Sequence, residues 1–156
     1  MSRRRPAVPR VIPPDARYGN LELAKFINRL MQRGKKTTAQ RIVYKAFEII
    51  EEQSNRDPVE VFEQAMRNAT PMVEVKPKRV GGATYQVPTE LRRSRAEALA
   101  QRWIIRGARG RAGIPMRNGL AQELMDASRG EGSAVRRKDE LHRMAEANRA
   151  FVHYRR

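Results

Sequence analysis

The chain has 156 residues and a large excess of positive charge. Lys and Arg number 33 against 17 Asp and Glu, a formal net charge of +16 at pH 7. This length fits one domain with a modest core. The lack of cysteine excludes disulfides and thiolate metal sites, and no apolar run is long enough for a membrane span, so we expect a soluble cytoplasmic protein. The charge favours a nucleic-acid partner.

Residues 1–18 are predicted to form a basic, flexible tail. Four prolines prevent a helix there, and the segment has little apolar surface to bury. The segment contains one acid, Asp15, and five arginines. The arginines are Arg3, Arg4, Arg5, Arg10 and Arg17. Such a tail can order against phosphates, or it can serve only as a solubilising end.

Three helices are predicted before the middle of the chain. The first runs from Asn20, a good N-cap, to Gly34, and the second starts at Thr37. The third starts at Asp57, with a proline in its first turn, and ends before Pro71. Apolar residues recur at helical spacing in all three, which predicts one packed helical body.

Residues 72–88 are predicted to form a β-hairpin arm. Residues 73–78 alternate between apolar and charged types, the period of a strand with two unlike faces. Gly81 and Gly82 favour a tight turn, and residues 84–87 supply the returning strand. The arm also carries three cations: Lys76, Lys78 and Arg79.

A fourth helix, capped by Ser94 with Glu97 and reaching about residue 109, carries a stripe of arginines. Four of them fall within about 60° of one another on the helix surface: Arg95, Arg102, Arg106 and Arg109. Their spacing places no acid among them, which favours binding of a polyanion over a solvated face, although both interpretations stay open. Trp103 is expected in the core.

Two further helices are predicted towards the C-terminus. A weaker one passes through Leu120 and Ala127, and a last one is capped by Ser133. The last helix is expected to face the core with six residues: Leu141, Met144, Ala145, Asn148, Phe151 and Val152. The predicted fold class is therefore mainly α, a single-domain bundle of about six helices in residues 19–156 with one protruding β-hairpin arm between the third and fourth helices.

Catalytic patterns are absent from the sequence. The two histidines, His142 and His153, are eleven residues apart, too far along a helix to pair with each other, and no metal-ligand spacing occurs. Glu123 and Asp126 could pair as acid and base, but this spacing usually reflects helix surface or salt bridging. We expect no enzyme activity, no metal and no cofactor.

Three stretches resemble the family of small ribosomal subunit protein seven, in its bacterial type. The first places Asn20, Glu22, Phe26-Ile27, Gly34-Lys35-Lys36, Ile42-Val43 and Ala46 at the family's spacings. The second is the arm, Val73-Glu74-Val75-Lys76 followed by residues 79–88. The third is the end of the chain, with Ala134-Val135, residues 144–148, Ala150-Phe151 and residues 153–155. The resemblance covers nearly the whole chain. Gly119 stands where the family commonly has Arg.

The resemblance implies a primary binder of small-subunit ribosomal RNA that nucleates folding of the head domain. It implies contacts with ribosomal proteins nine and eleven, a position near the exit-site tRNA and the messenger exit path, and in some members repression of their own operon. Positions of rRNA contact would be Arg3, Arg4, Arg5, Arg10, Lys25, Arg29, Lys35, Lys36, Arg41, Lys76, Lys78, Arg79, Arg95, Arg102, Arg106 and Arg109. The part facing tRNA and mRNA would be Val80, Gly81, Gly82, Ala83, Thr84, His142, Arg143 and Asn148.

Two alternatives stay open at this point. An architectural DNA binder would use the arm in the minor groove with Pro77 as a wedge, but such proteins usually dimerise, and we see no seam that predicts a homo-oligomer. An RNA-processing enzyme would need an acid–base or metal cluster.

Overall fold

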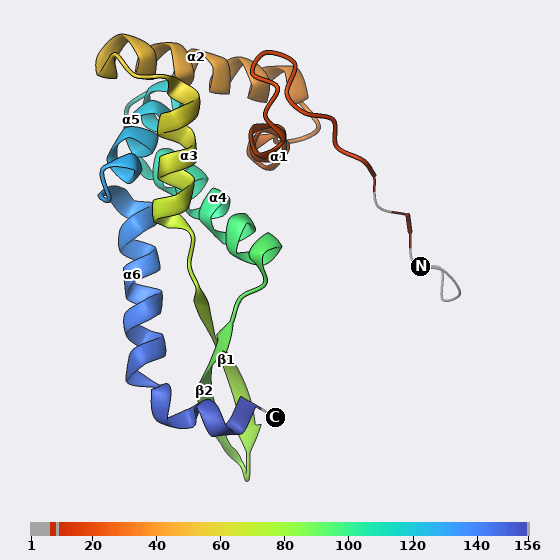
Figure 1. Cartoon of the computed structure of the whole chain (residues 1–156), viewed down its shortest axis with the longest axis vertical. Helices are drawn as coiled ribbons and strands as arrows, with labels where there is room; N and C mark the ends of the chain where they lie inside the picture. The colour runs from red at the N-terminus through yellow and green to blue at the C-terminus, as the bar shows by residue number, and fades with distance from the viewer. Residues whose placement is uncertain (1–6, 9, 156) are drawn as a thin grey trace. The chain divides into compact units, whose positions relative to one another are not determined.

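The computed structural model of the chain describes residues 7–8 and 10–155. Helices predominate in it, and a two-stranded antiparallel hairpin lies between α3 and α4 (Figure 1), which confirms the predicted fold class. The elements are α1 Leu21–Leu30, α2 Lys36–Ser54, α3 Pro58–Ala69, β1 Val73–Val80, β2 Ala83–Glu90, α4 Arg93–Gly110, α5 Met116–Ser128, α6 Gly132–Ala147 and the short 3-10 helix η1 Arg149–Arg155. The chain divides into two compact units, residues 1–40 and 41–156, which are described separately.

In the first unit, a turn around Asp15 leads into α1. The buried Asp15 carboxylate accepts hydrogen bonds from the backbone N–H groups of Arg17 and Tyr18, both at 3.1 Å. Asn20 caps α1 as predicted, because its Oδ1 accepts from the N–H of Leu23 at 3.0 Å. The end of the predicted tail is therefore a defined turn in the structure.

The predicted end of the first helix at Gly34 is wrong. Helix α1 stops at Leu30, and the chain then makes a turn in which Arg33 and Gly34 have positive φ angles of 51° and 73°. Two consecutive residues in the left-handed region cannot continue a right-handed helix, so Gly34 belongs to the turn before α2.

In the second unit, α3, α4, α5 and α6 pack together around the core. Asp57 caps α3 through the N–H of Val59 at 2.9 Å, with Pro58 in the first turn, as predicted. The rings of Phe47 and Phe62, both fully buried, lie with their centroids 5.9 Å apart. The Nδ2 of Asn68 donates to the carbonyl oxygens of Ala127 and Ser128 at the end of α5, which satisfies two groups that the helix leaves unpaired.

Two predicted caps are wrong. Helix α4 begins at Arg93, so Ser94 lies inside its first turn, and Glu97 pairs with Arg93 at 2.7 Å and not with the backbone. Helix α6 begins at Gly132, and the hydroxyl of Ser133 donates to a side chain of α5. In both cases the helix begins earlier than predicted, because its N-cap residue, Arg92 or Glu131, lies two positions before the predicted cap.

The hairpin is confirmed and is longer than predicted. Its strands pair from Val73 opposite Glu90 to Val80 opposite Ala83. Gly81 and Gly82, with φ angles of 57° and 90°, form the two-residue turn.

The C-terminal segment braces this arm. Figure 1 shows α6 running beside the hairpin and η1 lying across it. The ring of Tyr85 on β2 lies 5.1 Å from that of Phe151 and 5.0 Å from that of Tyr154. Lys78 Nζ donates to the carbonyl oxygen of Tyr154 at 2.7 Å. An isolated two-stranded hairpin is marginally stable, so these contacts explain why the arm is ordered.

The predicted inward stripe of the last helix is wrong at two positions. Met144 is 43% exposed and Val152 is 39% exposed. Met144 is exposed because that end of α6 extends beyond the helical body beside the hairpin (Figure 1). Val152 lies in the 3-10 helix after Asn148, which has three residues per turn, so the spacing of an α-helix no longer predicts which side chains face inward. In residues 7–8 and 10–155, no helix is both long enough and apolar enough to span a membrane.

Candidate nucleic-acid interface

An acidic residue of the arm connects it to the start of α4. The carboxylate of Glu74 on β1 is 8% exposed and lies 2.9 Å from Arg95 Nε and 3.1 Å from Lys76 Nζ. Burial alone would raise the pKa of Glu74, but hydrogen bonds and charge attraction from Arg95 and Lys76 outweigh it and hold the pKa below its usual value. Within the predicted arginine stripe, Arg95 is therefore already paired with a carboxylate from another element.

The rest of the stripe is open to solvent. Arg102, Arg106 and Arg109 are exposed along α4. Within the described part of the chain, no acidic side chain lies within ion-pair distance of Arg102 or Arg106. Unpaired guanidinium groups in one row repel each other, and phosphate groups would relieve that repulsion.

The cations of the arm have unequal roles. Arg79 is exposed near the tip, whereas the Nζ of Lys78 is bound to the backbone of Tyr154 and Lys76 is bound to Glu74. At the tip, Gly81, Gly82, Ala83 and Thr84 are exposed and Val80 is half-buried. The tip therefore presents mainly backbone groups, and its few small side chains leave room for a binding partner to approach closely.

The predicted RNA-contacting cations in the first part of the chain are also accessible to solvent. Their exposure is given separately for the two compact units. In the first unit, Lys25 is half-buried, and Arg10, Arg29, Lys35 and Lys36 are exposed. In the second unit, Arg41 is exposed on α2. Arg3, Arg4 and Arg5 lie outside the described residues.

Two residues predicted to face tRNA or mRNA also make structural contacts. The Nε2 of His142 accepts a hydrogen bond from the backbone N–H of Met72 at 3.1 Å, which joins α6 to the base of the arm. The Nδ2 of Asn148 donates to the carbonyl oxygen of Met144 at 2.8 Å and thereby satisfies the end of α6. Arg143, between them in sequence, is exposed.

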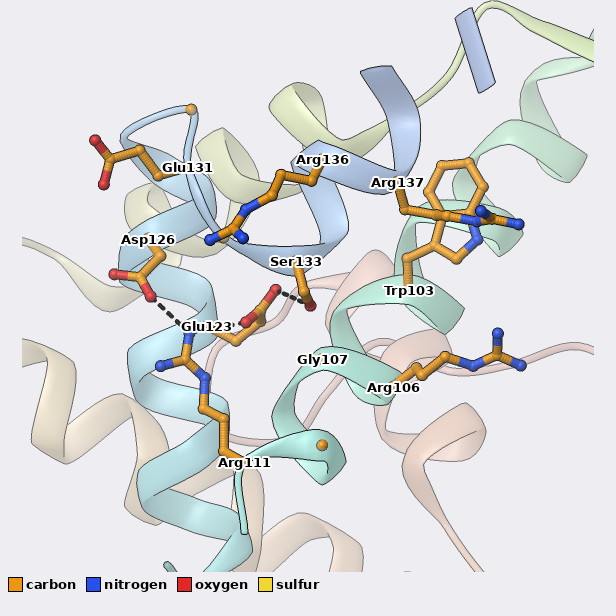
Figure 2. Close-up of a pocket in the computed structure, with 13 residues that line it drawn as sticks. Trp103, Arg106, Gly107, Arg111, Glu123, Asp126, Glu131, Ser133, Arg136 and Arg137 are labelled. Atoms are coloured by element: carbon orange, nitrogen blue, oxygen red, sulfur yellow. Dashed lines mark hydrogen bonds and ion pairs between the residues drawn. The ribbon is translucent and has the colours of Figure 1, made fainter. Parts of the chain in front are cut away.

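Sequence reasoning missed a pocket between α4, α5 and α6 (Figure 2). Its volume is about 840 Å³. Trp103 and Arg106 line it from α4, and Arg136 and Arg137 line it from α6. Trp103, expected in the core, is only partly buried. The adjacent pair Arg136-Arg137 was the available sequence signal, but only the fold brings it opposite the stripe on α4.

An ion cluster forms one end of this pocket. Glu123 is 1% exposed and accepts hydrogen bonds from the Ser133 hydroxyl at 2.9 Å and the Ala134 N–H at 3.0 Å, so this α5 side chain caps α6. Arg111 Nη2 bridges Glu123 at 2.8 Å and Asp126 at 2.6 Å (Figure 2). Burial would lower the pKa of Arg111, but the two carboxylates raise it above its usual value. The pairing of Glu123 and Asp126 through Arg111 is thus salt bridging, as expected, and of the three only Glu123 is buried.

Close backbone approach makes this cluster possible. A Cβ atom on Gly107 would lie 2.2 Å from Ser133 Oγ and 2.6 Å from the Glu123 carboxylate. One on Gly119 would lie 2.7 Å from the carbonyl oxygen of Ala108, so α4 and α5 pack too closely there for any side chain. In the described ranges 7–8 and 10–155, no group of three His, Cys, Asp or Glu residues could hold a metal ion.

Comparison with known proteins agrees with the family resemblance. The family described as Ribosomal protein S7p/S5e matches residues 2–149. The chain is 56% identical over 155 residues to the small ribosomal subunit protein uS7 of Dehalococcoides mccartyi, with 99% of each chain covered. It is 56% identical over 153 residues to that of Thermotoga petrophila, covering 98% of this chain and 99% of the relative. It is 55% identical over 154 residues to that of Chloroflexus aggregans, covering 99% and 98%. The chain therefore belongs to the ribosomal protein S7p/S5e family and is a structural protein of the ribosome.

Proposed function

We propose that this chain is a primary binder of small-subunit ribosomal RNA, acting in the cytoplasm within the ribosome, and that it nucleates folding of the head domain. The observation that supports this most directly is the row of exposed arginines on α4, of which Arg102 and Arg106 have no acidic partner in the part of the chain that the structure describes. A chain with a net charge of +16 that leaves these groups open has surface suited to several phosphates.

The mechanism is electrostatic. Helices of folded RNA repel each other through their phosphates, and cations fixed between them lower that repulsion for one arrangement only. The ordered arm and helical body fix the backbone that carries the cations before RNA binds, so little backbone entropy is lost on binding. The deep, narrow major groove of A-form RNA hides base edges, so recognition is mainly of shape, with a few unpaired bases.

The arm and the C-terminal segment have a second role in this proposal. The exposed tip, Gly81 to Thr84, approaches the exit-site tRNA and the messenger exit path, together with Arg143 on α6. His142 and Asn148 support this surface through their contacts at the base of the arm and at the end of α6. The neighbours are ribosomal proteins nine and eleven of the small subunit, and the protein represses its own operon by binding the messenger. Crosslinking of the protein in small subunits, followed by mass spectrometry, tests these neighbours directly.

Substitution of two unpaired arginines tests RNA binding. We choose Arg79→Gln with Arg102→Gln, because Arg95→Gln would also leave the Glu74 carboxylate with one partner fewer and so disturb the fold. The double variant should bind a transcript of the small-subunit head at least tenfold more weakly. Arg56→Gln with Arg117→Gln is the matched control, because both arginines are exposed and neither has an acidic side chain within ion-pair distance among the described residues. Equal affinities of the two double variants would contradict the proposed surface.

Competition between ligands tests the DNA alternative. We expect the head transcript to displace duplex DNA of equal length, because the cations are arranged for a branched RNA fold. Preference for duplex DNA would overturn the proposal.

A further inference from the structure

The pocket between α4 and α6 has two unlike ends. At one end, the carboxylates of Glu123 and Asp126 are neutralised by Arg111. Figure 2 shows Trp103 and Arg106 at the other end, away from Asp126 and Glu131. The pocket therefore combines a polar, internally paired wall with an aromatic and cationic end.

Two cations that line the pocket are available to a ligand. Arg106 lies at the aromatic end, whereas Figure 2 shows the side chain of Arg136 turned toward the end with Asp126 and Glu131. Arg106 and Arg136 are exposed, and neither has an acidic side chain within ion-pair distance among the residues that the structure describes. Arg137 is bound to Glu140 at 2.8 Å and so adds less net charge. Glu131, which is exposed, lines the opposite end and would repel an anion there.

Trp103 supplies the apolar half of the site. Its indole is only partly buried and borders a pocket of about 840 Å³, a size in the range of small-ligand sites. Aromatic rings beside arginines hold unpaired bases by stacking, while the guanidinium groups hold the phosphate. A carboxylate or an inorganic anion would use the arginines but leave the indole uncovered, and a duplex would not offer a base face.

From this arrangement we infer that the pocket binds one unpaired nucleotide of RNA, with its base stacked on Trp103 and its two flanking phosphates bound by Arg106 on one side and Arg136 on the other. The inference rests on the proposed RNA binding and adds to it a specific site on the α4–α6 face. The single-stranded nucleotide would come from a bulge or loop in the bound RNA, where a base can turn out of its stack.

The fluorescence of the protein tests this directly, because Trp103 is the single tryptophan of the chain. The full-length protein is titrated with a single-stranded oligoribonucleotide of about eight residues, with a blunt RNA duplex of the same sequence and with inorganic phosphate. We expect saturable quenching by the single strand only. Equal quenching by the duplex or by phosphate would overturn the inference, because neither presents an unstacked base.

Substitutions test whether the proposed nucleotide site lies in this pocket. Arg106→Gln with Arg136→Gln should lower the affinity for the single strand at least tenfold, whereas the control, Arg56→Gln with Arg117→Gln, should leave the affinity within about threefold. Trp103→Phe keeps an aromatic ring and should lose less affinity than Trp103→Leu, which should lose roughly five- to a hundredfold. Circular dichroism checks that each variant is folded. The arginine double variant remains informative if Trp103→Leu does not fold.

Failure of this inference is distinguishable from failure of the proposed function. Tight binding of the head transcript with no change in Trp103 fluorescence would overturn the nucleotide site alone. No binding of any RNA would overturn the proposed function.

Discussion

The Oε2 atom of Glu74 on β1 accepts a hydrogen bond from Nε of Arg95 on α4 at 2.9 Å. These residues are 21 apart in the sequence and join the base of the arm to the first turns of α4. The carboxylate also binds Lys76 on its own strand. This acid therefore joins His142 in holding the base of the arm against the helical body.

Replacement of Glu74 by Gln should weaken this junction. The variant loses the charge-assisted bonds to Arg95 and Lys76, whose side chains are more than half exposed, so we expect a loss of about 1 kcal/mol in the free energy of unfolding. That corresponds to a fall in Tm of roughly 2–4 °C for a chain of this size. Thermal unfolding followed by circular dichroism measures it. Glu146→Gln, at an exposed ion pair, is the control and should change Tm by less than about 1 °C.

Acid should remove the difference between the wild type and Glu74→Gln. Because the folded state holds the pKa of Glu74 below its ordinary value of 4.5, ionised Glu74 contributes stability above that pH. As pH falls through the folded pKa, the carboxylate is protonated in both states and its contribution disappears. Urea unfolding at pH 7 should separate the two proteins, and unfolding well below pH 4 should not. A difference that grows in acid would contradict the role of the ionised carboxylate.

Tyr85→Leu should loosen the arm without unfolding the body. The substitution removes ring contacts with Phe151 and Tyr154, each worth about 0.5–1.5 kcal/mol beyond the buried area. Hydrogen exchange of amides in β1 and β2 should become about tenfold faster, while amides of α4 and α5 keep their rates. Thr84→Ala, at the exposed tip, is the control. Unchanged exchange in the Tyr85 variant would show that η1 does not brace the arm.

Substitution of two glycines of α4 by alanine should change the stability of the protein in opposite directions. Gly107→Ala places a methyl group 2.2 Å from Ser133 Oγ, so we expect a loss of about 1–3 kcal/mol. Gly110→Ala meets nothing within 4 Å and should stabilise the helix by up to about 1 kcal/mol. Urea unfolding compares the two on the same helix. A neutral Gly107→Ala would mean that the side chains of Ser133 and Glu123 can move away from α4 without cost.

Local patterns predicted much of this fold. Asn20 and Asp57 cap helices as expected, and Gly81-Gly82 turns the hairpin, because in each case the deciding contact lies within a few residues. The predicted cap at Ser133 was wrong for the opposite reason. Glu123, ten or more residues away in sequence, caps α6, and no local pattern can indicate that.

The same distinction between local and distant contacts applies to the candidate site. Helical spacing predicted a row of arginines, and Arg102 and Arg106 are exposed on α4. It could not show that Glu74 pairs with Arg95, nor that Arg136 lies across a pocket from Trp103, because both depend on how α4 packs against other elements.

The salt dependence of binding to a transcript of the small-subunit head tests the central claim, that fixed cations engage several phosphates at once. If about eight phosphates are contacted, log affinity should fall with log salt concentration at a slope of roughly −6 to −7. A slope shallower than about −2 in the folded, monodisperse protein would contradict it.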